Sequence, residues 1–291
     1  MASSQIEEFL RRGVQFGLDM IAISRPLTCC AEGLWVWVGA RIVADGQVHS
    51  AVWPSIVSVV LLTASAQSFN DAEDIVGDKL TRPNRPLPSG RVSVSQARLY
   101  SFTCVIAGVV AASIASLHVA VLAAFIGVGG LSYSRWLKRI PMVGNLTVAA
   151  VACTPVFLGA VTIERPNLLI FIAMAMVASQ MLGYEILKDV RDIDDDSRVG
   201  LRSFAAAVST VTWVWVVRVS LIVAASFALA PWFTTATGGL YYLMIAVPLV
   251  FVPNAVAAAL CSNPERSSVA RWLIVGSWFP ALLCFYLLPG L

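Results

Sequence analysis

The stretch SFNDAEDIVGDKLTRPNRPLPSGR, residues 68–91, joins an acidic segment to a basic, proline-rich loop. Its aspartates, Asp71, Asp74 and Asp78, stand at i, i+3 and i+7, which on an α-helix places them on one face. The stretch directly follows an apolar run, Ala51–Gln67, that is long enough to cross most of a bilayer. Carboxylates at the mouth of a membrane helix indicate a functional site, because like charges this close repel unless a cation compensates them.

The composition excludes an ordinary soluble domain. The 291 residues are 58% hydrophobic and only 13% charged, with a mean hydropathy of +0.79. A soluble domain carries about 25% charged residues, so this chain is predicted to reside in the lipid bilayer. The six cysteines form no C-x-x-C pair and are interpreted as small buried residues rather than zinc ligands or disulfides. Neither nucleic acid nor an obligate protein partner is indicated.

Nine apolar runs follow an amphipathic lead-in at residues 1–12, and each is near the length of about 20 residues that a bilayer requires, although the fourth is short. They are Val14–Val43, Ala51–Phe69, Ala97–Ser116, Val119–Tyr133, Val143–Val161, Leu168–Leu187, Phe204–Leu229, Leu240–Leu260 and Val269–Leu288. The sequence therefore predicts an all-α integral membrane protein. Residues 1–291 would form one domain, with nine helices in a bundle around a central apolar cavity.

The basic residues predict the orientation of this bundle. Cytoplasmic loops of membrane proteins carry an excess of lysine and arginine. With a cytoplasmic N-terminus, 16 of the 20 basic residues fall on the inner side, and only Arg41 and Arg165 fall on the outer side. We therefore expect a multi-pass protein whose N-terminus and acidic loops face the cytoplasm, with the active site capped on that side.

A second acidic segment repeats the spacing of the first. The sequence YEILKDVRDIDDD, residues 184–196, places Asp189, Asp192 and Asp196 at i, i+3 and i+7, each 118 residues after its counterpart. The predicted topology brings both segments to the same side of the membrane. If the two helix ends meet, at least six carboxylates surround one space and require cations to offset their repulsion.

Acidic and basic residues together indicate a site for a metal-bound diphosphate. Mg²⁺ takes oxygen ligands and prefers a few carboxylates plus substrate phosphates to an all-protein cage. The same loops carry side chains suited to phosphate oxygens, namely Lys79, Arg82, Arg85, Lys138, Arg139, Lys188 and Arg191. Two solvated loops that only orient the protein would need these basic residues but not matched aspartate triplets. A diphosphate at the mouth of an apolar bundle suggests an allylic prenyl diphosphate, whose cation a dry chamber would protect from water.

These motifs resemble those of the UbiA superfamily of intramembrane prenyltransferases. The family pattern N-D-x-x-D-x-x-x-D is matched at residues 70–78, R-P-x-R-P-[IL]-P-S-G at 82–90, and D-x-x-D-x-x-x-D at 189–196. YSRWLKRIPMVGN at 133–145 and the R-P pair at 25–26 are similar to further family stretches. The resemblance implies a nine-helix fold and Mg²⁺-dependent transfer of a prenyl group from an allylic diphosphate to an aromatic or lipid-like acceptor. We expect two Mg²⁺ ions, bound with the diphosphate.

The resemblance and the positions of the charged residues together assign roles to individual residues. The catalytic residues are expected to be Asp71, Asp74, Asp189 and Asp192, and the metal ligands to be these four with Asp78 and Asp196. The residues expected to bind the substrates are Asn70, Arg85, Lys138, Arg139, Tyr184, Lys188, Arg25 and Glu32. Glu32 lies about two turns beyond Arg25, where a buried acid is costly unless it is paired or faces a polar cavity. Pairing with a basic residue is favoured over acceptor binding or proton removal.

Two alternatives remain open at this point. Some members of the superfamily are terpene cyclases, in which the cation closes on its own double bonds without an acceptor. A cation transporter also uses intramembrane carboxylates, but the many basic residues beside these clusters suit a polyanion better. The sequence departs from the family pattern at Arg191 and Asp195, where relatives often have an acid and a glycine. The loop at 82–90 resembles the chlorophyll-synthase and geranylgeranylglyceryl-phosphate-transferring branch more than the hydroxybenzoate branch.

Overall fold

A computed structural model of the protein describes residues 2–44, 46–47, 50–163, 165–198, 200, 202–234, 240–263 and 265–288, and these ranges contain helices but no strand. The first half comprises α1 (Ala2–Ser24), α2 (Pro26–Val43), η1 (Ser50–Val52), α3 (Trp53–Glu73), α4 (Ile75–Thr81), α5 (Val94–Ala115), α6 (Leu117–Arg135) and η2 (Leu137–Arg139). The second half comprises α7 (Val143–Ala152), α8 (Thr154–Ile163), α9 (Leu168–Arg198), α10 (Phe204–Ala207), α11 (Thr210–Thr234), α12 (Leu240–Ala246), the π-helical η3 (Val247–Phe251), α13 (Val252–Leu260) and α14 (Ser267–Leu287).

Eight helices in the described ranges are long and apolar enough to cross a membrane. They coincide with the second to ninth runs expected from the sequence, so the multi-pass architecture is confirmed. The fourth is longer than expected, because α6 covers Leu117–Arg135. The seventh starts later than expected, because α11 begins only at Thr210, after the short α10. The count of nine is not confirmed, since the first run does not form one long helix.

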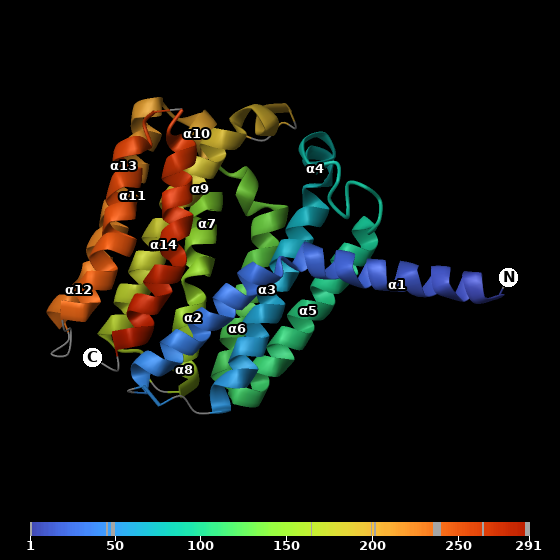
Figure 1. The fold of residues 1–291 in the computed structure, drawn as a ribbon, viewed down its shortest axis with the longest axis horizontal. Coiled ribbons are helices and arrows are strands. Elements are labelled where there is room, and N and C mark those ends of the chain that lie inside the picture. Colours follow the sequence, from blue (N-terminus) through green and yellow to red (C-terminus); the bar gives the residue numbers. More distant parts are fainter. Residues whose placement is uncertain are drawn as a thin grey trace.

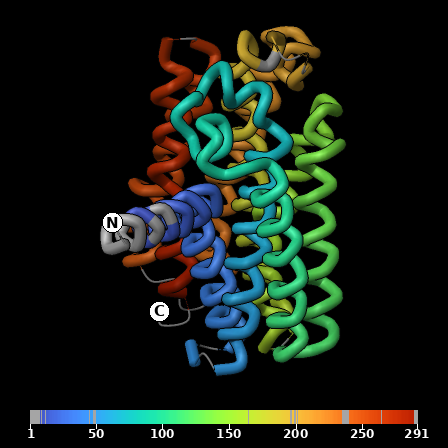
Figure 2. Tube along the Cα trace, turned by 90° about the vertical axis from the view of Figure 1, so that its right-hand side faces the viewer, coloured from blue at the N-terminus to red at the C-terminus, as the bar shows by residue number. Residues whose placement is uncertain are grey.

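The first expected helix is broken at Arg25. Pro26 occupies the first turn of α2, and a residue before proline avoids the right-handed helical conformation. Arg25 instead adopts a left-handed conformation with φ 52° and ψ 69°. The lead-in is continuous with α1, which projects sideways from the bundle (Figure 1) and is seen almost end-on in Figure 2. α2 lies inside the bundle against α3, α8 and α14.

Two small residues let α2 and α8 approach very closely. A Cβ atom on Gly39 would lie 1.9 Å from the backbone oxygen of Val156, and one on Gly159 would lie 1.9 Å from that of Val36. Membrane helices gain little from burying apolar surface against each other, so such close backbone packing is a main source of their association. The α2–α8 contact therefore fixes the position of α2 in the bundle.

Both acidic segments lie at the same end of the bundle. In Figure 1 the upper end carries α4, which follows α3, and α10, which follows α9. α4 also packs against α9. The parallel arrangement that was expected for the two acidic helix ends is thus present in the fold.

Candidate active site

The first acidic segment bends at its middle aspartate. Asp71 lies in the last turn of α3, Asp74 occupies the break with φ −93° and ψ 5°, and Asp78 lies in α4. The amide of Asn70 donates a hydrogen bond of 2.8 Å to the Asp74 carboxylate across this bend. The expectation of three aspartates on one continuous helix face is therefore wrong, although Asp71 and Asp78 are both buried.

Arg25 reaches this segment from the break between α1 and α2. Its Nη2 donates a hydrogen bond of 2.7 Å to Oδ1 of Asp71. A left-handed conformation costs a non-glycine residue roughly 1–2 kcal/mol. Strain of this kind is concentrated at functional sites, where the surrounding structure holds it in place. The break between α1 and α2 therefore places the Arg25 side chain against the acidic segment.

The basic loop after α4 folds back onto the same aspartates. Nη1 of Arg85 lies 3.0 Å from Oδ2 of Asp78 and 3.7 Å from Oδ1 of Asp71. Arg82 lies 3.6 Å from Asp78. The two buried carboxylates thus share one guanidinium partner, Arg85, which offsets the repulsion that their proximity would otherwise cause.

The second acidic segment lies on one continuous helix. α9 does not end near Leu187 as expected but runs to Arg198, so Asp189 and Asp192 share a helix face. Lys188 forms an ion pair with the buried Glu185, and Nη2 of Arg191 donates to Oδ2 of Asp192 at 2.5 Å. The side chain of Asp196 lies outside the described part of the chain.

One short segment, running from η2 into the first turn of α7, contacts both acidic segments. Lys138 forms an ion pair with Asp74, and the amide of Asn145 donates a hydrogen bond of 2.9 Å to Asp189. Gly144 permits this arrangement, because a Cβ there would lie 2.9 Å from the Cα of Lys138. Asp74 and Asp189, 115 residues apart in the sequence, are therefore held by the two ends of one eight-residue segment.

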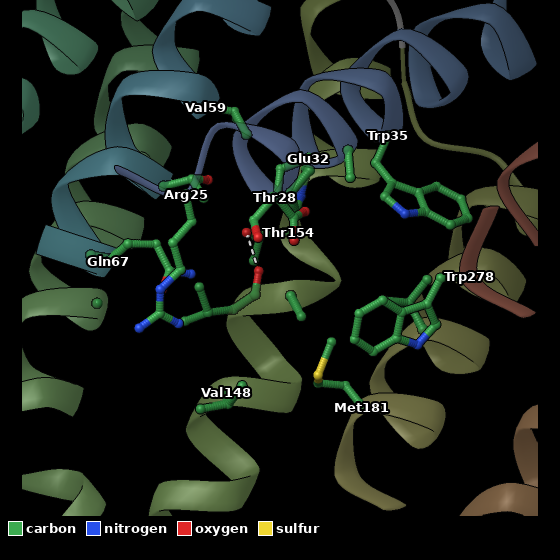
Figure 3. A pocket seen from close by; sticks show the side chains of 18 of the residues that line it. Arg25, Thr28, Glu32, Trp35, Val59, Gln67, Val148, Thr154, Met181 and Trp278 are labelled. Carbon is green, nitrogen blue, oxygen red and sulfur yellow. Dashed lines mark hydrogen bonds between the residues drawn. The ribbon is translucent and has the colours of Figure 1, made fainter. Parts of the chain in front are cut away.

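A pocket of about 640 Å³ opens beside these charged groups. Its polar end is lined by Arg25, Asn70, Tyr133, Tyr184, Glu185 and Lys188. Mostly apolar side chains line the rest, and Figure 3 shows Trp35 and Trp278 on the side opposite Arg25, with Glu32 and Thr28 of α2 between them. The rings of Tyr184 and Trp278 pack edge to face, with their centroids 5.1 Å apart. A central cavity enclosed by nine helices remains a prediction.

The aspartates whose side chains are described do not form a metal cage on their own. Among the described side chains, no three histidine, cysteine or acidic residues lie close enough together to hold a metal ion. Each of Asp71, Asp74, Asp78 and Asp192 is paired with a basic side chain instead. This donor set fits Mg²⁺ that takes a few carboxylate oxygens and completes its coordination with phosphate oxygens.

The structure differs from the predicted residue set in three respects. Arg139 is exposed and forms no ion pair with the acidic segments in the described part of the chain. No basic partner of Glu32 is found among the described residues, so the expected pairing is wrong. Asn145, Tyr133 and Glu185 were not predicted as site residues. In the sequence, Tyr133 and Asn145 could have been found from the 133–145 stretch, which begins with this tyrosine and ends with the G-N pair. Glu185 could have been found as an acid one helical turn before Lys188.

Fold and site together define a multi-pass membrane protein with a charged cluster at one end of a largely apolar pocket. The UbiA prenyltransferase family matches residues 33–285. The chain belongs to this family and is a prenyltransferase.

Curated relatives match most of the chain. A digeranylgeranylglyceryl phosphate synthase of Methanopyrus kandleri is 30% identical over 232 residues, which are 80% of this chain and 84% of that protein. One from Haloquadratum walsbyi is 27% identical and is matched over 96% of both chains.

Solved structures share the fold. A structure described as a digeranylgeranylglyceryl phosphate synthase has a TM-score of 0.79 at 20% identity and covers 95% of this chain and 100% of that chain. A UbiA homologue from Archaeoglobus fulgidus bound to GPP and Mg²⁺ has a TM-score of 0.68 at 14% identity and covers 91% of this chain and 99% of that chain.

Proposed function

We propose that the protein transfers a prenyl group from an allylic prenyl diphosphate to a hydroxyl group of a lipid-like acceptor, with Mg²⁺ bound alongside the diphosphate. One observation carries this proposal. Lys138 and Asn145, at the ends of one segment, contact Asp74 and Asp189 from the two acidic segments. A single ligand between these segments would meet carboxylates from both, together with several basic side chains.

The carboxylates would hold the metal and the basic residues the diphosphate. Two Mg²⁺ ions would take ligands from Asp71, Asp74, Asp78, Asp189, Asp192 and Asp196. The diphosphate would be bound by Asn70, Arg25, Arg85, Lys138, Tyr184 and Lys188, and the exposed Arg139 would have to move to join them. Bound Mg²⁺ would act as a Lewis acid that stabilises charge on the departing diphosphate.

The ion pairs of the site suggest how the charges rearrange when the donor binds. Arg25 and Lys138 donate to Asp71 and Asp74, which are oxygen ligands suited to a divalent cation. In a metal-bound diphosphate, the metal ion can bind the carboxylates, and the phosphate oxygens can accept hydrogen bonds from the basic groups that are released. The site exchanges one set of charge pairs for another, which limits the cost of burying the diphosphate.

The acceptor is proposed to be a glyceryl phosphate lipid with a free hydroxyl. Support comes from the relatives named digeranylgeranylglyceryl phosphate synthase, which match 80% or more of the chain. The name denotes a glyceryl phosphate that carries two geranylgeranyl groups, so a singly prenylated glyceryl phosphate would accept the second group. The pocket's apolar lining suits the hydrocarbon chains of both substrates. The basic loops favour a cytoplasmic position for the site.

Product analysis tests this proposal. Purified protein in nanodiscs would receive geranyl, farnesyl or geranylgeranyl diphosphate and Mg²⁺, each with a prenylglyceryl phosphate, with an aromatic acceptor such as a hydroxybenzoate, or alone. Mass spectrometry should detect a new ether lipid only with the first acceptor. A prenylated aromatic product would contradict the proposed acceptor. A cyclic terpene formed from the diphosphate alone would identify a cyclase instead.

Removal of divalent metal should abolish this activity. A saturating chelator is expected to lower the transfer rate by at least about 100-fold, because the departing charge loses its main stabilising group. Added Mg²⁺ should restore the rate, which is measured by release of diphosphate. Undiminished transfer in saturating chelator would contradict a metal-bound diphosphate.

A further inference from the structure

Glu32 carries a buried carboxylate oxygen that has no hydrogen-bond partner among the described residues. It lies on α2 and lines the pocket beside Thr28 (Figure 3), and its Oε2 is inaccessible and makes no hydrogen bond within the described part of the chain. Buried polar side-chain atoms are nearly always hydrogen-bonded, because an unpaired one costs about 1–3 kcal/mol. An unsatisfied carboxylate facing a substrate pocket indicates a group that meets its partner only when a substrate is bound.

Three other polar side chains of the same pocket already have partners. The amide of Gln180 donates to Asn254 at 3.0 Å and to Ser277 at 2.8 Å. The hydroxyl of Thr154 donates to the backbone oxygen of Val151 at 2.7 Å, and that of Ser134 donates to Gly130. Gln180 thus connects α9 to α13 and α14, and the two hydroxyl groups bond to backbone oxygens three or four residues earlier. Glu32 differs from them, because its Oε2 makes no hydrogen bond within the described part of the chain.

The position of Glu32 suits the reacting end of an acceptor. It is seven residues along α2 from Arg25, which corresponds to about 10 Å along the helix axis. Arg25 marks the diphosphate end of the pocket through its hydrogen bond to Asp71. On the other side the pocket is apolar, with Trp35 on the same helix and Trp278 opposite. Glu32 thus lies between the charged end and the hydrocarbon part, where the carbon of a bound allylic diphosphate and an acceptor hydroxyl would meet.

We propose that Glu32 binds the acceptor hydroxyl and takes its proton as the ether bond forms. In this step the acceptor oxygen forms a bond to C1 of the prenyl group, and the bond between C1 and the diphosphate oxygen breaks. The electron pair of that bond leaves with the diphosphate, and the proton of the hydroxyl passes to the Glu32 carboxylate. This inference rests on the proposed function and adds that the acceptor nucleophile is a weakly acidic alcohol, which requires a base.

The test compares Glu32→Gln, Glu32→Asp and wild type with two acceptors in nanodiscs. The acceptors are a prenylglyceryl phosphate and its thiol analogue, in which sulfur replaces the oxygen of the reacting hydroxyl. Glu32→Gln should lower kcat for the hydroxyl acceptor by at least about 100-fold, the usual contribution of a general base. The loss should be below about tenfold for the thiol, which ionises far more readily than an alcohol. Glu32→Asp should recover part of the hydroxyl activity.

Donor binding and a remote acid serve as controls. The Kd of a non-reactive prenyl thiolodiphosphate with Mg²⁺ should stay within about twofold of wild type in Glu32→Gln. Glu265→Gln, which removes an exposed acid before α14, should leave both rates unchanged. Wild-type hydroxyl transfer in Glu32→Gln, an equal loss with both acceptors, or weakened donor binding would overturn the role of Glu32. Failure of the wild type to use any hydroxyl acceptor would overturn the proposed function itself.

Discussion

Replacing Asp71 or Asp189 with alanine should abolish prenyl transfer while leaving the protein folded in the membrane. Each change removes a carboxylate from a different acidic segment, on α3 and α9 respectively. We expect the rate of diphosphate release to fall at least about 100–1,000-fold in either variant, since both segments are proposed to serve one metal-bound diphosphate. The double variant should be little worse than either single one, because residues that act as a unit are not additive.

Asp19→Asn is a matched control for these variants. Asp19 is also a buried aspartate paired with an arginine, because Nε of Arg91 lies 3.1 Å from it, but it does not line the pocket. Its replacement should leave the rate per folded molecule within a few-fold of wild type. Equal losses in Asp19→Asn and Asp71→Ala would show that breaking any buried ion pair inactivates the protein. Near-normal transfer in Asp189→Ala would exclude the second acidic segment from the reaction.

Gly159→Ala and Gly39→Ala should each destabilise the fold strongly. A new Cβ would lie 1.9 Å from a backbone oxygen of the facing helix, so α2 and α8 would have to separate. Overpacking of this kind costs about 3 kcal/mol or more when backbone must move, which corresponds to a fall in melting temperature of roughly 5–10 °C. Thermal unfolding in detergent, followed by tryptophan fluorescence and size-exclusion chromatography, measures this effect.

Gly276→Ala provides the comparison for the glycine variants. No atom lies within 4 Å of a Cβ built at Gly276, in the middle of α14. Alanine favours a helix by about 1 kcal/mol over glycine, so this variant should be as stable as wild type or slightly more so. A melting temperature of Gly159→Ala equal to that of Gly276→Ala would contradict the close α2–α8 packing.

The spacing of the aspartates and the apolar runs predicted much of the architecture. Eight helices were located because each apolar run is long enough to span a bilayer, which constrains length directly. That both acidic segments lie at one end followed from the number of helices between them. The site was recognised from the two aspartate triplets, because loops that only orient a protein in the membrane need basic residues but no aspartates.

Backbone geometry at the site was harder to predict. The bend at Asp74 and the extension of α9 to Arg198 depend on tertiary contacts rather than on local spacing. The break at Arg25 had a signal in the following proline, but the apolar run obscured it. The contact between Asn145 and Asp189 spans 44 residues, and the unpaired state of Glu32 is a property of the folded pocket. No residue pattern of the sequence encodes such distances.

A structure with Mn²⁺ and a non-reactive prenyl thiolodiphosphate tests most directly whether the two acidic segments bind one metal-bound diphosphate. Anomalous scattering would locate the metal. The metal is expected between the carboxylates of Asp71 or Asp74 and those of Asp189 or Asp192, with the diphosphate beside it and the prenyl chain in the pocket lined by Trp35 and Trp278. Metal held by one segment alone, or a diphosphate away from both, would contradict the proposed site.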